Sequence, residues 1–246
     1  MGSRFDASTS IGGVLYKDVK HAILGALAEG EWKPGEVIPS ERKLIERFGV
    51  SIGTLRKAID ELVAESILIR HQGRGTFVAT HRQEDHFFRF FRIVRQDGHR
   101  EYPTVNLARF QRGKADKVEA AALGLAVGDA VMRFTNILSL EGKPVLTDAI
   151  TVSAERFKTL TEKKLRERPN TLYNFYQDAF GVNIIRTEER VRAALADADD
   201  EALLGVPAGS PLLEILRVAS SYHDERIEYR VSRVSTTHHE FTLTQP

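Results

Sequence analysis

Residues 39–57, PSERKLIERFGVSIGTLRK, predict two short helices separated by a tight turn. Leu44 and Phe48 fall on one face of the first helix, and Ser40 can cap its N-terminus. Gly49 suits the left-handed backbone that often ends a helix, and Ser51 can cap the next helix. Helices joined by so short a turn cross steeply. The stretch therefore predicts a helix-turn-helix.

The second helix has one apolar face and an N-terminal end that carries small or cationic groups. Its apolar stripe is Leu55, Ile59, Leu62 and Val63. The remaining N-terminal positions are Ser51, Gly53, Thr54, Arg56 and Lys57. A recognition helix enters the DNA major groove by such residues, because bulky apolar side chains would block its approach.

A β-hairpin wing is predicted directly after this helix. Residues 67–70 favour a strand, residues 71–75 a glycine-containing turn, and residues 76–78 the return strand. Gly73 lets the backbone approach a groove, and Arg70 and Arg74 can neutralise phosphates. A leading helix should complete the core with Tyr16, Val19, Ile23, Ala26 and Leu27. Each signal alone also fits a serine that only caps or an arginine that is only solvated, but their joint order indicates a DNA reader.

Composition limits the other possibilities. The chain has 246 residues and no cysteine, with a net charge of +1, and residues 1–80 contain 11 basic and 10 acidic side chains. Any positive surface is therefore local, and specific binding should depend on a few arginines in two copies of the chain. We predict no metal site, because the histidines at 81, 86, 238 and 239 have no carboxylates at supporting spacings. We also predict no catalytic residue and no cofactor, because the sequence shows no nucleophile-base pair and no phosphate-binding loop. No apolar run is long enough for a membrane span, so we expect a cytoplasmic protein.

The second half of the chain contains an internal repeat. The run at residues 123–128, LGLAVG, recurs as LGVPAG at residues 204–209. Each copy follows an alanine-rich helical stretch and precedes a predicted hairpin, the first turning at residues 141–143 and the second at residues 223–225. A helix is predicted from Thr171 to Gly181. These units predict an α+β fold in which one antiparallel sheet has flanking helices.

Two polar residues interrupt the apolar face of the first hairpin. If its turn has three residues, Leu140 pairs with Pro144 and Asn136 falls opposite Asp148. A buried carboxylate needs either an internal partner, such as Arg133 or Arg186, or a polar ligand. Both interpretations have equal weight at this point.

Residues 80–96 interleave basic and aromatic side chains and are predicted to be a linker. Its phenylalanines, residues 87, 88, 90 and 91, are expected to pack in the second domain rather than to bind nucleic acid.

Residues 12–79 resemble the winged helix-turn-helix domain of the GntR family of bacterial transcription regulators. The resemblance lies in PSER at 39–42, FGVS at 48–51, TLR at 54–56 and GRGTFV at 73–78. It implies that Arg42, Thr54 and Arg56 contact DNA and that Gly73 enters the minor groove. Many members have an arginine directly after the Ser51 position, where this chain has Ile52, which suggests a shifted operator sequence. The predicted DNA-binding residues are Ser40, Arg42, Ser51, Gly53, Thr54, Arg56, Lys57, Arg70, Gly73 and Arg74.

Residues 97–243 resemble the UTRA effector domain of the HutC subfamily, which is similar to the chorismate-lyase fold. The matching motifs are EGKPV at 141–145, TLY at 171–173, LGV at 204–206 and SPLL at 210–213, with Gly181, Glu228 and Tyr229. The resemblance implies a metabolite pocket and dimerisation. Its predicted effector-binding residues are Asn136, Asp148, Thr171, Tyr173 and Glu228, although Glu228 lies on a strand face that we expect to be solvated. Phosphosugar-binding members have arginines at the positions of Asn136 and Leu138, so a less anionic effector is expected.

The leading hypothesis is a homodimeric repressor that a small-molecule effector releases from double-stranded operator DNA with an inverted repeat. The alternatives are an enzyme of chorismate-lyase-like fold with a DNA-binding appendage, and an architectural DNA binder that responds to no ligand.

Overall fold

The structure is a computed structural model that describes residues 15–81, 90–168 and 171–243. The chain divides into two compact units, residues 1–80 (unit 1) and residues 81–246 (unit 2). Most of the predicted linker, from Arg82 to Arg89, lies outside the described residues, as do residues 12–14 of the predicted first domain.

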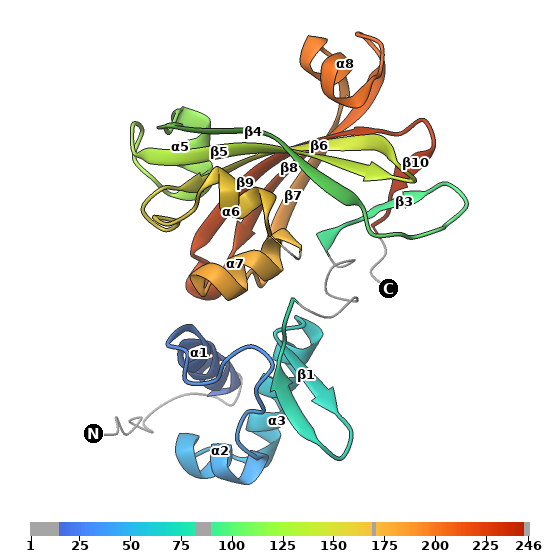
Figure 1. Cartoon of the computed structure of the whole chain (residues 1–246). Coiled ribbons are helices and arrows are strands. Elements are labelled where there is room, and N and C mark those ends of the chain that lie inside the picture. The colour runs from blue at the N-terminus through green and yellow to red at the C-terminus, as the bar shows by residue number, and fades with distance from the viewer. Residues whose placement is uncertain (1–14, 82–89, 169–170, 244–246) are drawn as a thin grey trace. The chain divides into compact units, whose positions relative to one another are not determined.

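Within its described residues, 15–80, unit 1 has three helices and a two-stranded wing (Figure 1). The helices are α1 (Leu15–Ala28), α2 (Glu41–Phe48) and α3 (Ile52–Ala64), and the wing strands are β1 (Leu68–His71) and β2 (Gly75–Val78). Their inner faces form one core in which Ile23, Leu44 and Leu55 are fully buried. This arrangement confirms the helix-turn-helix and wing that the sequence predicts.

The turn between α2 and α3 depends on the two residue types that mark it in the sequence. Gly49 ends α2 in the left-handed conformation with a φ of 66°, which costs glycine little. The Ser51 hydroxyl accepts a hydrogen bond from the Thr54 amide at 3.2 Å and caps α3. Ser40 occupies the N-cap position of α2, but its side chain makes no capping bond, so that expected interaction is wrong.

Unit 2 is built on a six-stranded antiparallel sheet in the order β4-β5-β6-β9-β8-β7 (Figure 1). The strands are β4 (Thr104–Lys114), β5 (Ala130–Leu140), β6 (Lys143–Ser153), β7 (Arg186–Leu195), β8 (Pro211–Ser220) and β9 (Arg226–Ser235). The helices are α5 (Lys117–Leu123), α6 (Glu162–Arg166), α7 (Leu172–Phe180) and α8 (Ala198–Leu204), with a 3-10 turn, η1, at Tyr222–Asp224. Strands β3 (Ile93–Arg95) and β10 (His239–Phe241) form a separate small sheet.

The internal repeat of the sequence corresponds to two copies of the same series of elements within unit 2, β4-α5-β5-β6 and β7-α8-β8-β9. Each short helix begins with a capping box, made by Asp116 with Glu119 in α5 and by Asp197 with Asp200 in α8. Because β6 pairs with β9, the two copies of the repeat join through their last strands into the one continuous sheet of unit 2.

The first hairpin has a shorter turn than expected and still reaches the predicted register. Leu140 pairs with Lys143 rather than Pro144, so the turn contains only Glu141 and Gly142, both with positive φ. A bulge between Leu138 and Ser139 then shifts the register by one residue. The two deviations offset each other, and Asn136 does lie opposite Asp148.

The two faces of the sheet are covered by different helices. On one face, α7 contributes Tyr176 to a core that includes Phe134 and Ile150. On the other face, α5 contributes Glu119, which bonds to Arg133 and Thr151 on adjacent strands. Since successive side chains of a strand alternate between faces, residues 148, 150 and 152 of β6 belong to the α7 face.

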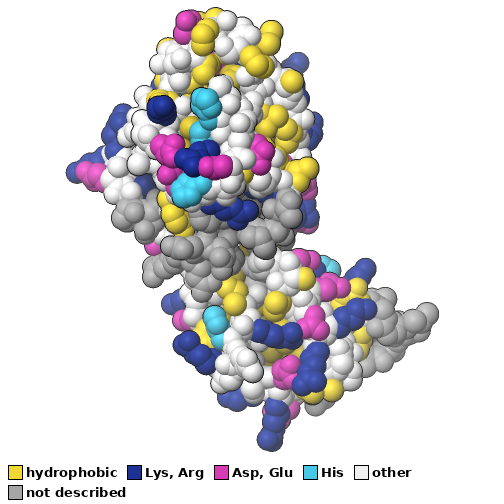
Figure 2. Space-filling model, turned by 90° about the vertical axis from the view of Figure 1, so that its right-hand side faces the viewer, with side chains coloured by type: hydrophobic (Ala, Val, Ile, Leu, Met, Phe, Trp, Pro, Cys, Tyr) yellow, Lys and Arg dark blue, Asp and Glu magenta, His cyan; other side chains and the backbone are white. Residues whose placement is uncertain are grey.

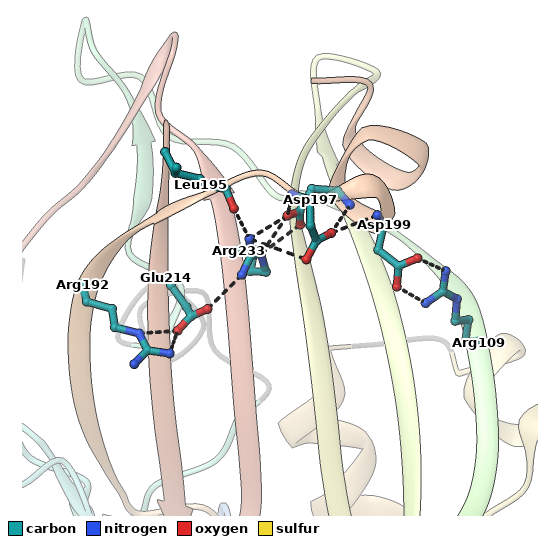
Figure 3. Close-up of polar contacts among 8 residues, drawn as sticks. Arg109, Arg192, Leu195, Asp197, Asp199, Glu214 and Arg233 are labelled. Atoms are coloured by element: carbon teal, nitrogen blue, oxygen red, sulfur yellow. Dashed lines mark hydrogen bonds and ion pairs between the residues drawn. The ribbon is translucent and has the colours of Figure 1, made fainter. Parts of the chain in front are cut away.

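Helix α8 is held on the α5 face by charged contacts (Figure 3). Arg233 of β9 donates to Asp200 at 2.9 and 3.0 Å, to Glu214 at 3.0 Å and to the Leu195 carbonyl at 2.7 Å. Asp199 reaches Arg109 of β4 at 2.6 Å. These contacts fix α8 across the sheet, which leaves the α7 face for the cavity described below.

Candidate functional site

The N-terminal end of α3 is an outward-facing surface of unit 1. Ser51, Gly53, Arg56 and Lys57 are exposed, and Thr54, whose hydroxyl lies 2.9 Å from that of Ser51, is half-buried. The buried stripe of α3 is Leu55, Ala58, Ile59 and Leu62, which replaces Val63 of the predicted stripe with Ala58. The predicted reading residues of α3 therefore share a surface.

The arginines near this surface are held by acidic neighbours within unit 1. Arg56 donates from Nε and Nη2 to Glu41 at 2.9 to 3.1 Å, and these hydrogen bonds raise its pKa above the usual value. Arg42 reaches Glu46 at 3.2 Å with a side chain that is 90% exposed. Arg70 pairs with Asp60. Figure 2 likewise shows Lys and Arg interspersed with Asp and Glu on the visible part of unit 1.

The wing tip is the turn between β1 and β2, formed by Gln72, Gly73 and Arg74. Gly73 has a φ of 72° and no neighbouring atom near the place a side chain would take, so its backbone is open to a close approach. Arg74 is exposed, with its guanidinium 5.8 Å from the centre of the Phe77 ring. Ser40 is also exposed, at the start of α2.

Unit 2 contains a cavity of about 900 Å³ between the α7 face of the sheet and the segments that cover it. Apolar walls come from residues such as Leu107, Leu138 and Val234. The polar and charged lining is Asn106, Asn136, Asp148, Arg166, Arg168, Thr171, Tyr173, Asn174, Arg217, Arg230 and Ser232, with His81 and Arg92. Four of the five predicted effector residues, Asn136, Asp148, Thr171 and Tyr173, therefore line one cavity.

Asp148 has an internal partner, and it is neither Arg133 nor Arg186. Arg230 of β9 donates to its carboxylate at 2.8 Å, and the Ser232 hydroxyl donates as well. Burial disfavours the charge on Arg230, but the carboxylates of Asp148 and Glu228 outweigh it and raise the arginine's pKa. The two side chains thus form a buried salt bridge in the lining of the cavity.

Glu228 is completely buried and does not line the cavity. Its carboxylate accepts hydrogen bonds from Tyr173 at 3.2 Å, Tyr176 at 2.9 Å and Arg230 at 2.8 Å. The expectation that this part of β9 is a solvated face is wrong, because α7 covers it. Burial and the nearby Glu228 charge raise the pKa of Tyr173 to about 12.

Three buried amide atoms in the cavity wall have no hydrogen-bond partner among the described residues. They are Oδ1 of Asn136 and both Oδ1 and Nδ2 of Asn174, whose side chains are each only 2% exposed. An unsatisfied buried polar group costs about 1–3 kcal/mol. Arg168 adds a cation that burial destabilises, which lowers its pKa, and its guanidinium donates a hydrogen bond to the Leu165 carbonyl at 2.5 Å.

His81 and Phe90, the described residues nearest to unit 1 along the chain on either side of residues 82–89, also form part of the cavity wall. Phe90 is buried against Tyr173, with ring centres 5.1 Å apart, and His81 lies 5.8 Å from the same ring. Arg217 of β8 donates to the Phe90 carbonyl at 2.6 Å and to Glu189 at 2.7 Å. The prediction that the phenylalanines pack in the second domain is confirmed for Phe90.

The sequence did not identify the arginines of this cavity. They come from three separate segments that only the folded chain brings together: Arg166 and Arg168 lie at and just after the end of α6, Arg217 on β8 and Arg230 on β9. Within the described ranges, no group of three or more His, Asp or Glu side chains is arranged to hold a metal ion. Among the helices described, none has the length and apolar character to cross a membrane.

Comparison with known families assigns both units. Residues 15–78 match the model of the bacterial regulatory proteins of the gntR family, and residues 99–240 match the UTRA domain. The chain belongs to the gntR family, with a UTRA domain. This gntR-family protein is a DNA-binding transcription regulator and not an enzyme, so the enzymatic alternative is rejected.

Curated relatives align with the regulator over most of its length. The probable fructoselysine utilization operon transcriptional repressor of Escherichia coli (strain K12) is 25% identical over 238 residues, covering 94% of this chain and 93% of the relative. The histidine utilization repressor of Klebsiella aerogenes is 29% identical over 204 residues, covering 82% and 83%, in line with the HutC subfamily.

Among solved structures, the ligand-binding domain of a putative GntR-family transcriptional regulator from Bordetella bronchiseptica superimposes with a TM-score of 0.60. It is 27% identical to this chain and covers 63% of this chain and 96% of its own. The predicted α+β class and the order of the two domains are confirmed.

Proposed function

We propose that the regulator is a cytoplasmic homodimeric repressor that binds an inverted-repeat operator and dissociates when a small molecule occupies the cavity of unit 2. Its family membership and the names of its relatives as repressors support this proposal. Two copies of unit 1 would read two half-sites, so the symmetry of the operator would mirror that of the dimer.

The DNA contacts are assigned to one continuous set of residues in unit 1. Thr54, Arg56 and Lys57 enter the major groove from α3, and Arg70, Gly73 and Arg74 bring the wing to the neighbouring backbone. Ser40, Arg42, Ser51 and Gly53 surround the first set and bind phosphates or allow close approach. Their exposure on α2, α3 and the wing is the observation that carries this assignment.

The Glu41 contact gives Arg56 a defined role in specificity. When Arg56 binds DNA, its guanidinium must give up its hydrogen bonds to the Glu41 carboxylate. This exchange is favourable only where the DNA offers a good acceptor, such as the edge of guanine. Wrong sequences would leave Arg56 on Glu41, where it makes three hydrogen bonds. The pair therefore suppresses nonspecific binding, in keeping with the nearly neutral charge of unit 1.

The effector is assigned to the unit 2 cavity, where it contacts Asn136, Asp148, Thr171 and Tyr173. Glu228 lies outside the cavity lining and positions two lining residues, Tyr173 and Arg230, by accepting hydrogen bonds from them. Groups of the ligand that both donate and accept hydrogen bonds would satisfy the amides of Asn136 and Asn174. We assign one anionic group of the ligand to Arg168, which has no carboxylate ion-pair partner in the described part of the chain.

Coupling between the two units is assigned to the segment after residue 80. Phe90 and His81 line the cavity, so a ligand there contacts the same stretch of chain that leads from unit 1. A ligand lowers DNA affinity only if it binds one conformation of this segment better than the other. Arg217, which holds the Phe90 carbonyl, is placed to link the two.

A gel-shift assay on DNA from upstream of the protein's own gene tests the reading surface. Arg56→Ala should weaken the specific complex of the dimer about 100- to 10,000-fold, because one bidentate base contact, worth about 10- to 100-fold, is lost in each half-site. Arg186→Ala, which removes an exposed arginine of unit 2, is the matched control and should leave binding unchanged. An Arg56→Ala complex as tight as that of the unchanged protein would reject the assigned surface.

A further inference from the structure

Ile52 is an apolar side chain at the position where a reading surface would ordinarily carry a polar one. It is the first residue of α3 and is 48% exposed. The buried stripe of α3 begins at Leu55 and does not include it. The start of the helix is capped by Ser51 through the Thr54 amide, so helix capping does not require the Ile52 side chain either.

The Ile52 side chain is partly open to solvent, at 48% exposure. Gly53 follows it and places no side chain beside it. Ile52 and Arg56 are four residues apart and are therefore neighbours on the helix surface. Arg56 itself is drawn toward α2 by Glu41. Ile52 thus projects beside the proposed base-reading arginine, from the end of α3 that leads into the groove.

An apolar group in the major groove has one favourable contact on the base edges. Thymine carries a C5 methyl group there, whereas the other three bases present hydrogen-bond donors and acceptors without it. Burying a branched aliphatic side chain against those polar edges would leave them without partners, which is unfavourable. The same side chain against a methyl group removes apolar surface from water on both sides.

We propose that Ile52 determines operator specificity by contacting the C5 methyl group of a thymine in each half-site. This inference rests on the proposed reading surface of α3 and adds to it one base identity. The contact stabilises the complex by burying the thymine methyl group, and removal of that one methyl group should weaken binding about fourfold. For a dimer on two half-sites the expected loss is about sixteenfold.

The experiment removes the methyl group from the DNA instead of the protein. An operator is first selected from random double-stranded DNA with the full-length protein, and each thymine is then replaced by deoxyuridine, which has the same hydrogen-bonding groups without the methyl. One thymine of each half-site should show the fourfold loss. With Ile52→Ala that position should become insensitive to the replacement, while Leu15→Ala, which truncates another exposed apolar side chain of unit 1, should retain the sensitivity.

A second variant tests the same position by changing its preference. Ile52→Arg should shift the selected base from thymine toward guanine, which an arginine binds through O6 and N7. Specific binding in which no thymine replacement depends on residue 52 would overturn this inference and leave the proposed function intact. If no specific sequence is selected at all, the proposed DNA-binding function fails, and this inference fails with it.

Discussion

Arg230 is the residue whose removal should most disturb unit 2. It lies between two buried carboxylates, 2.8 Å from Asp148 and 2.8 Å from Glu228, and its own side chain is 11% exposed. Arg230→Met keeps a side chain of similar length but leaves both carboxylates without their cation. Breaking a buried ion pair from one side costs about 3–5 kcal/mol. With two carboxylates affected, we expect the free energy of unfolding to fall by about 5 kcal/mol.

Thermal unfolding followed by circular dichroism measures this loss. For a protein of this size each kcal/mol lowers the melting temperature by about 2–4 °C, so Arg230→Met should melt about 10–20 °C lower. Arg186→Met is the matched control, because Arg186 also contacts two carboxylates, Glu188 and Asp224, but on an exposed surface. Its expected cost is below about 1 kcal/mol.

A third variant separates loss of charge balance from loss of packing. Arg230→Met combined with Asp148→Asn and Glu228→Gln should recover most of the melting temperature, because no buried charge is then left unpaired. If Arg230→Met and Arg186→Met melt within about 2 °C of each other, the buried network does not stabilise unit 2 and the reasoning is refuted.

Two further outcomes follow from the cavity wall. The pKa of Tyr173 is raised to about 12, so the stability that its neutral phenol contributes is fully present below pH 10 and is lost as the pH rises through about 12. Tyr173→Phe should therefore show a shallower loss of stability between pH 10 and 12 in urea titrations, and an unchanged slope would contradict this. Asn136→Leu removes an unsatisfied buried oxygen and should stabilise the ligand-free protein by about 1 kcal/mol in the same assay, at the expense of the effector response. A lower urea midpoint for this variant would show that Asn136 has a partner.

The sequence predicts unit 1 well because its signals are local. Gly49, Ser51 and the wing glycines impose backbone conformations within a few residues, so their order along the chain is enough to identify the fold. The prediction of a capping hydrogen bond from Ser40 was wrong, because a residue can occupy the N-cap position without a side-chain hydrogen bond.

Unit 2 is predicted less completely because its key contacts are distant in sequence. Glu228 and Arg230 alternate along β9 as a solvated face would, and only Tyr173 and Tyr176 of α7, more than fifty residues earlier, reveal that this face is buried. The edge strands β4 and β7 were not predicted, since most of β7 is exposed on both faces and has little apolar alternation. The pairing of Asn136 with Asp148 was predicted correctly from a turn of the wrong length. The observed two-residue turn and the bulge after Leu138 together give the same register as the predicted three-residue turn.

If the exposed N-terminal end of α3 enters operator DNA, site-specific photo-cross-linking should detect the contact. A photoreactive amino acid at Lys57, exposed on α3, should cross-link to bases in both half-sites of the selected operator. The same group at Lys163, a lysine of α6 whose side chain is 80% exposed, should give no cross-link. Specific operator binding without any cross-link from position 57 would contradict the account.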